Sequence, residues 1–154
     1  MGTALSQRLI QDHFQSPIQE AVLNLLLAAA FVQEQTERVF AKYEISPAQY
    51  NVLRILKGAH PAGHPRCEIA RRLIERAPDL TRMIDRLERR GLVERASSDQ
   101  DRRQSISRIT PRGLELVERM APAAAALHRV VSSKLTRSEA AMLSRLCEQL
   151  YAED

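Results

Sequence analysis

Arginine is the residue type whose placement carries most chemical information in this chain of 154 residues. The segment 66–108 contains twelve arginines, eight acidic residues and no lysine, whereas the rest of the chain holds 11 basic and 11 acidic residues. The whole net charge of +4 therefore falls in this segment. Because the planar guanidinium pairs in bidentate fashion with phosphates and guanine edges, the segment indicates nucleic acid as a partner. A solvated helix face rich in salt bridges is the alternative interpretation.

An apolar stripe within this segment predicts a helix from Pro78 to Arg90. Its members follow the i, i+3, i+4, i+7 spacing of one helix face: Leu80, Met83, Ile84 and Leu87. If the stripe is buried, the opposite face presents a hydroxyl and three guanidinium groups to solvent, together with two acids. These residues are Asp79, Thr81, Arg82, Asp85, Arg86 and Arg89.

Shorter elements flank this helix on either side. A short helix over about 67–74 precedes it, and two extended segments follow at 92–96 and 103–110. The polar stretch 97–102 separates the extended segments, so we expect a hairpin with a long polar tip. Its alternation is poor, because Ser105 and Ser107 share one face with Ile109.

Long helices are expected toward the two ends of the chain. The first, over about 18–43, is apolar on more than one side, which indicates burial against its own domain and against another subunit. A capping box at Ser46–Gln49 opens a helix that begins at Pro47. Pro111 opens a further helix to about 134, bent near Pro122, and a capping box at 136–139 starts the last one. The apolar stripe of that last helix comprises Leu143, Leu146, Cys147 and Leu150.

The composition favours a mostly helical protein with little sheet. Hydrophobic residues make up 44% and charged residues 27%, and Ala, Leu, Arg and Glu are abundant. The two cysteines lie far apart in a chain without a secretory signal pattern, which favours the reducing cytoplasm. The apolar run 22–32 is too short to span a membrane, so no membrane partner is expected.

Enzyme and metal functions find little support in the sequence. It has no Gly-rich phosphate loop, Gly-x-Ser-x-Gly elbow or His-Glu-x-x-His pair, and no cofactor or catalytic residue is expected. His60, His64 and Cys67 follow a His-x3-His-x2-Cys spacing, but a zinc site needs a fourth ligand. We therefore expect no metal site.

Two short helices followed by a basic hairpin form the layout of a winged helix-turn-helix. Residues 78–93, together with the wing residues 101–103 leading to 109–113, resemble the MarR family of bacterial transcription regulators. The resemblance covers about 18–152. It implies a mostly α fold with a small β wing, in which a winged helix-turn-helix spans about 46–110. Residues 18–43 and 111–152 would supply dimerisation helices, and 1–17 an N-terminal arm.

The resemblance implies a sequence-specific regulator that binds double-stranded DNA as a homodimer on a near-palindromic operator. It further implies a ligand-responsive repressor, with a small phenolic or other lipophilic effector bound between the dimer helices and the winged domain. The alternative from another class is a winged-helix scaffold that binds protein and not DNA. A salt-dependent mobility shift distinguishes the two.

Site residues also follow from the resemblance. DNA contacts are implied at Pro78, Thr81, Arg82, Arg86, Arg102 and Arg103. Arg103 would enter the minor groove, and Asp101 would orient it through a salt bridge. Phe31, Tyr50 and Leu53 are the candidates for the effector pocket. The chain departs from the family at Ser105 and Ser107, where apolar residues often stand in the wing strand.

Overall fold

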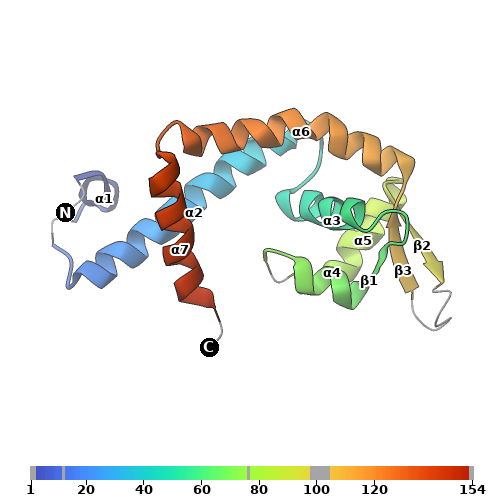
Figure 1. Cartoon of the computed structure of the whole chain (residues 1–154), viewed down its shortest axis with the longest axis horizontal. Coiled ribbons are helices and arrows are strands. Elements are labelled where there is room, and N and C mark those ends of the chain that lie inside the picture. The colour runs from blue at the N-terminus through green and yellow to red at the C-terminus, as the bar shows by residue number, and fades with distance from the viewer. Residues whose placement is uncertain (1–2, 12, 76, 98–104, 153–154) are drawn as a thin grey trace.

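The computed structural model describes residues 3–11, 13–75, 77–97 and 105–152, and it is mostly helical with one small antiparallel sheet (Figure 1). The predicted fold class is confirmed. Helices α2 and α6 run beside each other along the molecule, and the short helices and strands gather at one end (Figure 1). The elements in chain order are α1 (Thr3–Leu9), α2 (Pro17–Ala41), α3 (Pro47–Gly58), β1 (His64–Pro65), α4 (Arg66–Arg72), α5 (Leu80–Arg89), β2 (Val93–Ser97), β3 (Ser105–Ile109), α6 (Pro111–Ser132) and α7 (Arg137–Tyr151).

Local capping decides where the longer helices begin. Ser46 and Thr136 form the predicted capping boxes, in which each hydroxyl accepts a hydrogen bond from the backbone N–H three residues on. Ser16 and Thr110 cap α2 and α6 in the same way, each followed by proline at the first helical position. Helix α5 begins at Leu80, two residues later than predicted, with Asp79 at the N-cap.

The sheet has three strands in the order β1-β3-β2. The predicted hairpin is confirmed as β2 and β3, with Val93 opposite Ile109 and Ser97 opposite Ser105. Strand β1 was not predicted. It pairs His64 with Ser107, and this extra strand explains why Ser107 is buried although it is polar.

The apolar core lies where α3, α4, α5 and α6 meet the sheet. Residues with no exposed surface include Leu53, Leu56, Ile69, Leu87 and Met120. Each side chain of this kind contributes about 1.5–3 kcal/mol when it leaves water. On α5, Leu80, Ile84 and Leu87 are buried and Met83 is partly buried, as the stripe predicts. Burial of this stripe fixes which face of α5 remains available.

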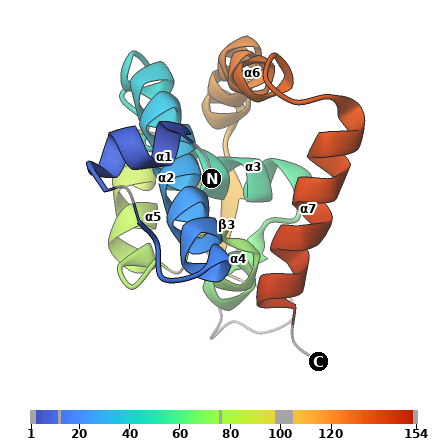
Figure 2. The same ribbon diagram turned by 90° about the vertical axis from the view of Figure 1, so that its left-hand side faces the viewer.

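The terminal helices leave much apolar surface uncovered. In α2 the buried residue is Phe40, and none of the described residues of α7 is buried. Figure 2 shows α7 standing apart from α2 and joined to the rest through its connection to α6. A cavity of about 390 Å³ opens between α2 and α7, lined by Ile18, Ala21, Val22, Asn24, Leu25, Ala28, Leu143, Leu146, Cys147 and Leu150. Across the described ranges, no helix combines the length and apolarity that a membrane crossing demands.

Candidate nucleic-acid interface

Helix α5 turns a polar face to solvent. Thr81, Arg82 and Arg86 are exposed, as burial of the opposite stripe requires, and the Arg82 side chain is 77% exposed. Pro78, just before the helix, is also exposed. These four residues are predicted DNA contacts, and the fold brings them to one helix and its entry.

The carboxylates of α5 are neutralised by arginines. Arg95 of β2 binds both Asp85 and Glu88, and its distance to the Glu88 carboxylate is 3.0 Å. Asp79 lies 3.5 Å from Arg82. The guanidinium of Arg86 forms no hydrogen bond or ion pair with any described residue. The exposed face of α5 therefore presents positive charge and donor groups, which is the character that phosphate and guanine edges require.

Several other arginines of the basic segment, among the residues that the structure describes, have structural partners. Arg71 and Arg72 pair with Glu68, and the Arg72 hydrogen bond lowers the pKa of the Glu68 carboxyl. Arg90 binds the backbone carbonyl oxygens of Tyr43 and Glu44, in the turn between α2 and α3. The arginine surplus seen in the sequence thus divides between groups that hold the fold together and groups on α5 that stay available.

Arg66 adds a group to this surface that sequence analysis missed. It is the first residue of α4, and its guanidinium donates a 2.8 Å hydrogen bond to the Thr81 hydroxyl of α5. Local spacing gives no signal for this contact, because the two residues lie 15 positions apart on different helices. Arg66 and Thr81 border an open hollow of about 690 Å³ between α4, α5 and the sheet, also lined by Pro65, Cys67, Ile84, Asp85, Arg95, Ser105 and Ser107.

The predicted wing-tip residues Asp101, Arg102 and Arg103 lie outside the described residues. Strands β2 and β3 lead to this tip from the base of the sheet, beside α5. The roles of the three residues stay predictions.

A cavity of about 410 Å³ lies between α2, α3 and α6, where an effector was expected. Of the three candidates for the effector pocket, Tyr50 lines this cavity, and Phe31 and Leu53 do not. Phe31 is exposed beneath the Lys134 ammonium, and Leu53 is wholly buried in the core. The lining is Val32, Thr36, Phe40, Pro47, Tyr50, Asn51, Arg54, Ile74, Ala124, Leu127, His128 and Val131.

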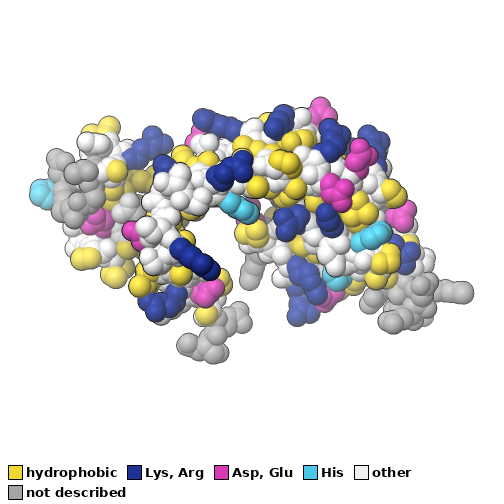
Figure 3. Space-filling model, turned by 45° about the horizontal axis from the view of Figure 1, so that its top comes forward, with side chains coloured by type: hydrophobic (Ala, Val, Ile, Leu, Met, Phe, Trp, Pro, Cys, Tyr) yellow, Lys and Arg dark blue, Asp and Glu magenta, His cyan; other side chains and the backbone are white. Residues whose placement is uncertain are grey.

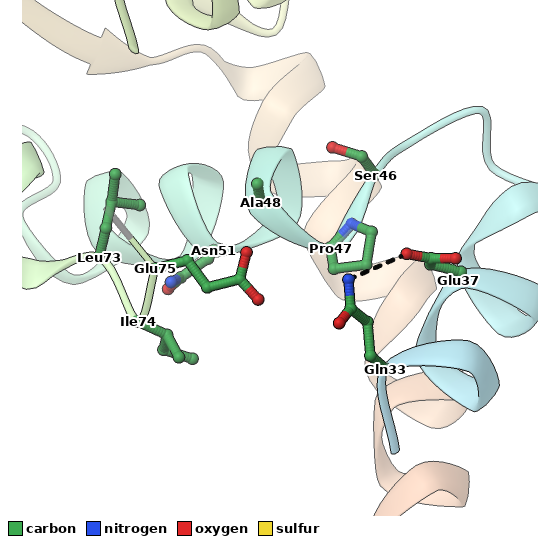
Figure 4. Close-up of a pocket in the computed structure, with 9 residues that line it drawn as sticks. All are labelled: Gln33, Glu37, Ser46, Pro47, Ala48, Asn51, Leu73, Ile74 and Glu75. Atoms are coloured by element: carbon green, nitrogen blue, oxygen red, sulfur yellow. Dashed lines mark hydrogen bonds between the residues drawn. The ribbon is translucent and has the colours of Figure 1, made fainter. Parts of the chain in front are cut away.

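A smaller cavity of about 250 Å³ adjoins it and shares Pro47, Asn51 and Ile74 (Figure 4). Gln33 and Glu37 reach it from α2 and are joined by a 3.3 Å hydrogen bond, and Leu73, Ile74 and Glu75 reach it from the segment after α4 (Figure 4). The two cavities together occupy the junction between the long terminal helices and the short-helix unit.

The face that carries α6 has a different character from the face of α5. Figure 3 shows its basic side chains interspersed with acidic and apolar ones. Charge of mixed sign gives a weak field at a distance, because neighbouring contributions cancel. This face is therefore a poorer candidate for nucleic acid.

Residues 45–105 of the chain match the sequence model of the MarR family. The chain is 37% identical to a MarR transcription factor from Planctomyces limnophilus, covering 89% of this chain and 99% of that one, with a TM-score of 0.69. Two further solved structures share less than 25% sequence identity with this chain, so their similarity shows the fold alone.

The S. aureus MepR–DNA complex is 22% identical, covers 82% of this chain and 93% of its own, and has a TM-score of 0.72. Bordetella bronchiseptica BpsR, whose DNA binding is regulated by 6-hydroxynicotinic acid, is 21% identical. The match covers 93% of this chain and 99% of BpsR, with a TM-score of 0.79.

Proposed function

Since this chain belongs to the MarR family of transcriptional regulators, we propose that it binds double-stranded DNA sequence-specifically, as a regulator and not an enzyme. One observation carries the proposal. The exposed Arg86 is unpaired among the described residues, and Arg82 is 77% exposed with one long contact of 3.5 Å to Asp79, while the helix's own carboxylates Asp85 and Glu88 are paired with Arg95 of β2. A helix about 10–12 Å across fits the major groove of B-DNA. The similarity in fold to MepR, solved with DNA, supports this docking.

In this arrangement α5 enters the major groove and the wing reaches the adjoining backbone and minor groove. Thr81, Arg82 and Arg86 contact phosphates and base edges, and Pro78 lies against the backbone at the helix entry. Arg102 and Arg103 of the wing reach the DNA next to it, with Asp101 orienting Arg103. The family resemblance supports these wing roles.

We also propose that the active form is a homodimer. The exposed apolar residues of α2 and α7 lose water contact only if a second surface covers them. A two-fold axis between two copies presents two α5 helices, and matching half-sites then lie about one helical turn apart. The operator is accordingly near-palindromic, and the protein acts on DNA in the cytoplasm.

The cavity beside Tyr50 is the proposed effector site of a ligand-responsive repressor. Its apolar lining suits a small lipophilic or phenolic ring. Arg54, which also lines the cavity, forms no hydrogen bond or ion pair with any described residue and is free to bind an acid group. The cavity borders the dimer helices and α3, so an occupant is in contact with elements that set the separation of the two α5 helices. Regulation of BpsR by an aromatic acid supports this choice.

Selection of bound sequences from a random duplex pool tests the proposed function. The purified protein is expected to enrich a near-palindromic site and to bind it about 10³-fold or more tightly than a scrambled duplex. Affinity should fall steeply with rising salt. Recovery of no sequence, with binding that salt does not change, would contradict the proposal and favour the scaffold function.

The effector proposal is tested on the selected duplex with 6-hydroxynicotinic acid and benzoic acid as probes. Either acid is expected to release DNA from the wild type, and Arg54→Met should abolish release without altering DNA affinity in the absence of the acid. If neither acid bound the protein by calorimetry, the assignment of the cavity to aromatic acids would be wrong.

A further inference from the structure

Two cavities meet at one turn of α3. Tyr50 and Arg54 line the effector cavity of about 410 Å³, and they also line a second cavity of about 400 Å³ between α3 and α6. Lys57 follows one turn later on α3 and, of these two cavities, lines only the second. The three residues follow the spacing i, i+4, i+7, so they share one face of the helix. The rest of the second lining is Gly58, Val117, Glu118 and Ala121.

Tyr50 brings an unused hydroxyl to this junction. The residue is only 8% exposed, and its ring packs against Phe40 with the ring centroids 4.7 Å apart. Its hydroxyl forms no hydrogen bond with any described residue. Among those residues, no buried side-chain oxygen or nitrogen lacks both a partner and contact with open space. The hydroxyl therefore opens into the cavities that Tyr50 lines, where it can donate to an acid group.

The two cations that follow Tyr50 on this face are weakly engaged. Arg54 has no hydrogen-bonding or ionic partner among the described residues, and the Lys57 ammonium lies 3.6 Å from the Glu118 carboxylate of α6. That distance is longer than a charge-assisted hydrogen bond, and the Glu118 side chain is 70% exposed, so another acid can displace it. The second cavity is thus cationic along α3, whereas apolar α6 residues such as Leu127 border the effector cavity.

We propose that the effector is an elongated amphipathic acid that spans both cavities. Its apolar body occupies the effector cavity, and its acid group lies between Arg54 and Lys57, beside the Tyr50 hydroxyl. This inference rests on the proposed function of a ligand-responsive regulator. Lys57 lies about 4.5 Å beyond Arg54 along the helix axis, so a short spacer between a ring and its acid group allows both contacts. The acid then replaces Glu118 as the partner of Lys57 and removes an ion pair between α3 and α6.

Calorimetry with two acids of different length tests this. Benzoic acid is too short to leave Arg54, whereas 5-phenylpentanoic acid has four methylene groups between its ring and its carboxyl group. Lys57→Met should weaken binding of the longer acid by about three- to tenfold, the range of one hydrogen bond, and leave that of benzoic acid unchanged. Glu118→Gln should strengthen binding of the longer acid, because it removes the competing carboxylate. Tyr50→Phe keeps the ring beside Phe40 and should weaken binding of both acids.

Two controls separate the site from bulk charge and from apolar contact. Arg119→Met removes a cation next to Glu118 on α6, but Arg119 lines neither cavity, so this variant should bind both acids like the wild type. The neutral amide 5-phenylpentanamide has the same apolar body and should bind equally to wild type and Lys57→Met. DNA affinity of Lys57→Met in the absence of acid should equal that of the wild type.

The outcomes distinguish this inference from the functions proposed above. Equal losses for both acids in Lys57→Met, or no loss for either, would overturn the inference and leave the effector cavity in place. Unchanged affinity of Tyr50→Phe for both acids would overturn it as well. Failure of both acids to bind the wild type would overturn it together with the effector cavity. A wild type that binds the acids but enriches no DNA sequence would contradict the regulator function and leave the acid site standing.

Discussion

The Arg95 guanidinium of β2 lies 3.0 Å from the Glu88 carboxylate of α5, and it also binds Asp85 on the preceding turn of that helix. One cation therefore balances two acids and ties the wing strand to the proposed DNA-facing helix. Its removal would leave two uncompensated carboxylates beside the phosphates.

We predict that Arg95→Met weakens DNA binding more than the loss of an ordinary surface arginine does. The expected loss exceeds about tenfold, because the variant both removes a cation and exposes two anions to the DNA backbone. Fluorescence anisotropy on the selected duplex at several salt concentrations measures it. Arg108→Met, on the neighbouring strand, is the control, since Arg108 contacts the Ala62 carbonyl and no acid among the described residues. Equal losses in the two variants would refute the idea that Arg95 shields the DNA from the charges of Asp85 and Glu88.

Leu146→Glu is expected to convert a homodimer into a monomer. Leu146 is half exposed on α7 and lines the apolar cavity between α2 and α7, so a charge there would be buried without a partner in the dimer. Light scattering should give twice the 17.4 kDa chain mass for the wild type and the mass of one chain for the variant. Ala141→Glu adds the same charge to the opposite face of α7 and should remain dimeric. A wild type of 17.4 kDa at micromolar concentration would contradict the proposal.

Elements set by local chemistry could be predicted from the sequence, whereas features set by distant pairing could not. Ser46 and Thr136 mark their helix starts because a cap needs only the next three residues. Strand β1 escaped prediction because its two residues acquire strand geometry only by pairing with β3, far along the chain. The strand that pairs His64 with Ser107 is only two residues long, too short to show a periodic pattern in the sequence.

The same division holds for the candidate site. The exposed face of α5 follows from the apolar stripe on its other side, so Arg82 and Arg86 could be found from spacing. Arg66 could not, because its contact with Thr81 depends on how α4 packs against α5. Phe31 was a candidate for the effector pocket that the resemblance implies, but its position on α2 places it outside the cavity that Tyr50 lines.

Two glycines should respond in opposite ways to replacement by alanine. A Cβ on Gly113 would lie 2.2 Å from the Leu92 carbonyl oxygen, so Gly113→Ala forces backbone apart and should cost at least about 2 kcal/mol of unfolding free energy. Gly58, at the end of α3, has nothing within 4 Å of the added atom, and its replacement should be neutral or stabilise by up to about 1 kcal/mol. Denaturant unfolding measures the difference, and comparable midpoints for the two variants would be inconsistent with this packing.

Acid should loosen the start of α7. The Glu139 carboxylate accepts hydrogen bonds from the Thr136 hydroxyl and backbone N–H, and these bonds lower its pKa below the ordinary value of 4.5. Because the folded-state pKa is depressed, this stabilisation is complete above pH 4.5 and is lost as pH falls through the folded-state value. Circular dichroism against pH should show helix loss there in the wild type. Glu139→Gln keeps a neutral acceptor, so its helix content should change less with pH below 4.5 than that of the wild type. The same acid-induced loss of helix in both proteins would exclude Glu139 as its cause.

The exposed arginines of α5 are the proposed DNA-contacting groups. Arg86→Ala and Arg82→Ala should each weaken specific binding by about 1–3 kcal/mol per half-site, because an arginine that meets a base edge or phosphate contributes in this range. The fold should stay intact, since neither side chain belongs to the core. Arg38→Ala removes the same charge from an exposed i, i+4 pair on α2 and serves as the control.

The most direct measurement is therefore the affinity of wild type, Arg86→Ala and Arg38→Ala for the selected duplex and its scrambled counterpart, titrated over a range of salt concentrations. We expect Arg86→Ala to lose about thirtyfold or more on the selected duplex, because each of the two half-sites loses about 1–3 kcal/mol. Its loss on the scrambled duplex should be much smaller, and Arg38→Ala should match the wild type. Equal affinity of Arg86→Ala and wild type for the selected duplex would contradict the assignment of α5 as the helix that reads DNA.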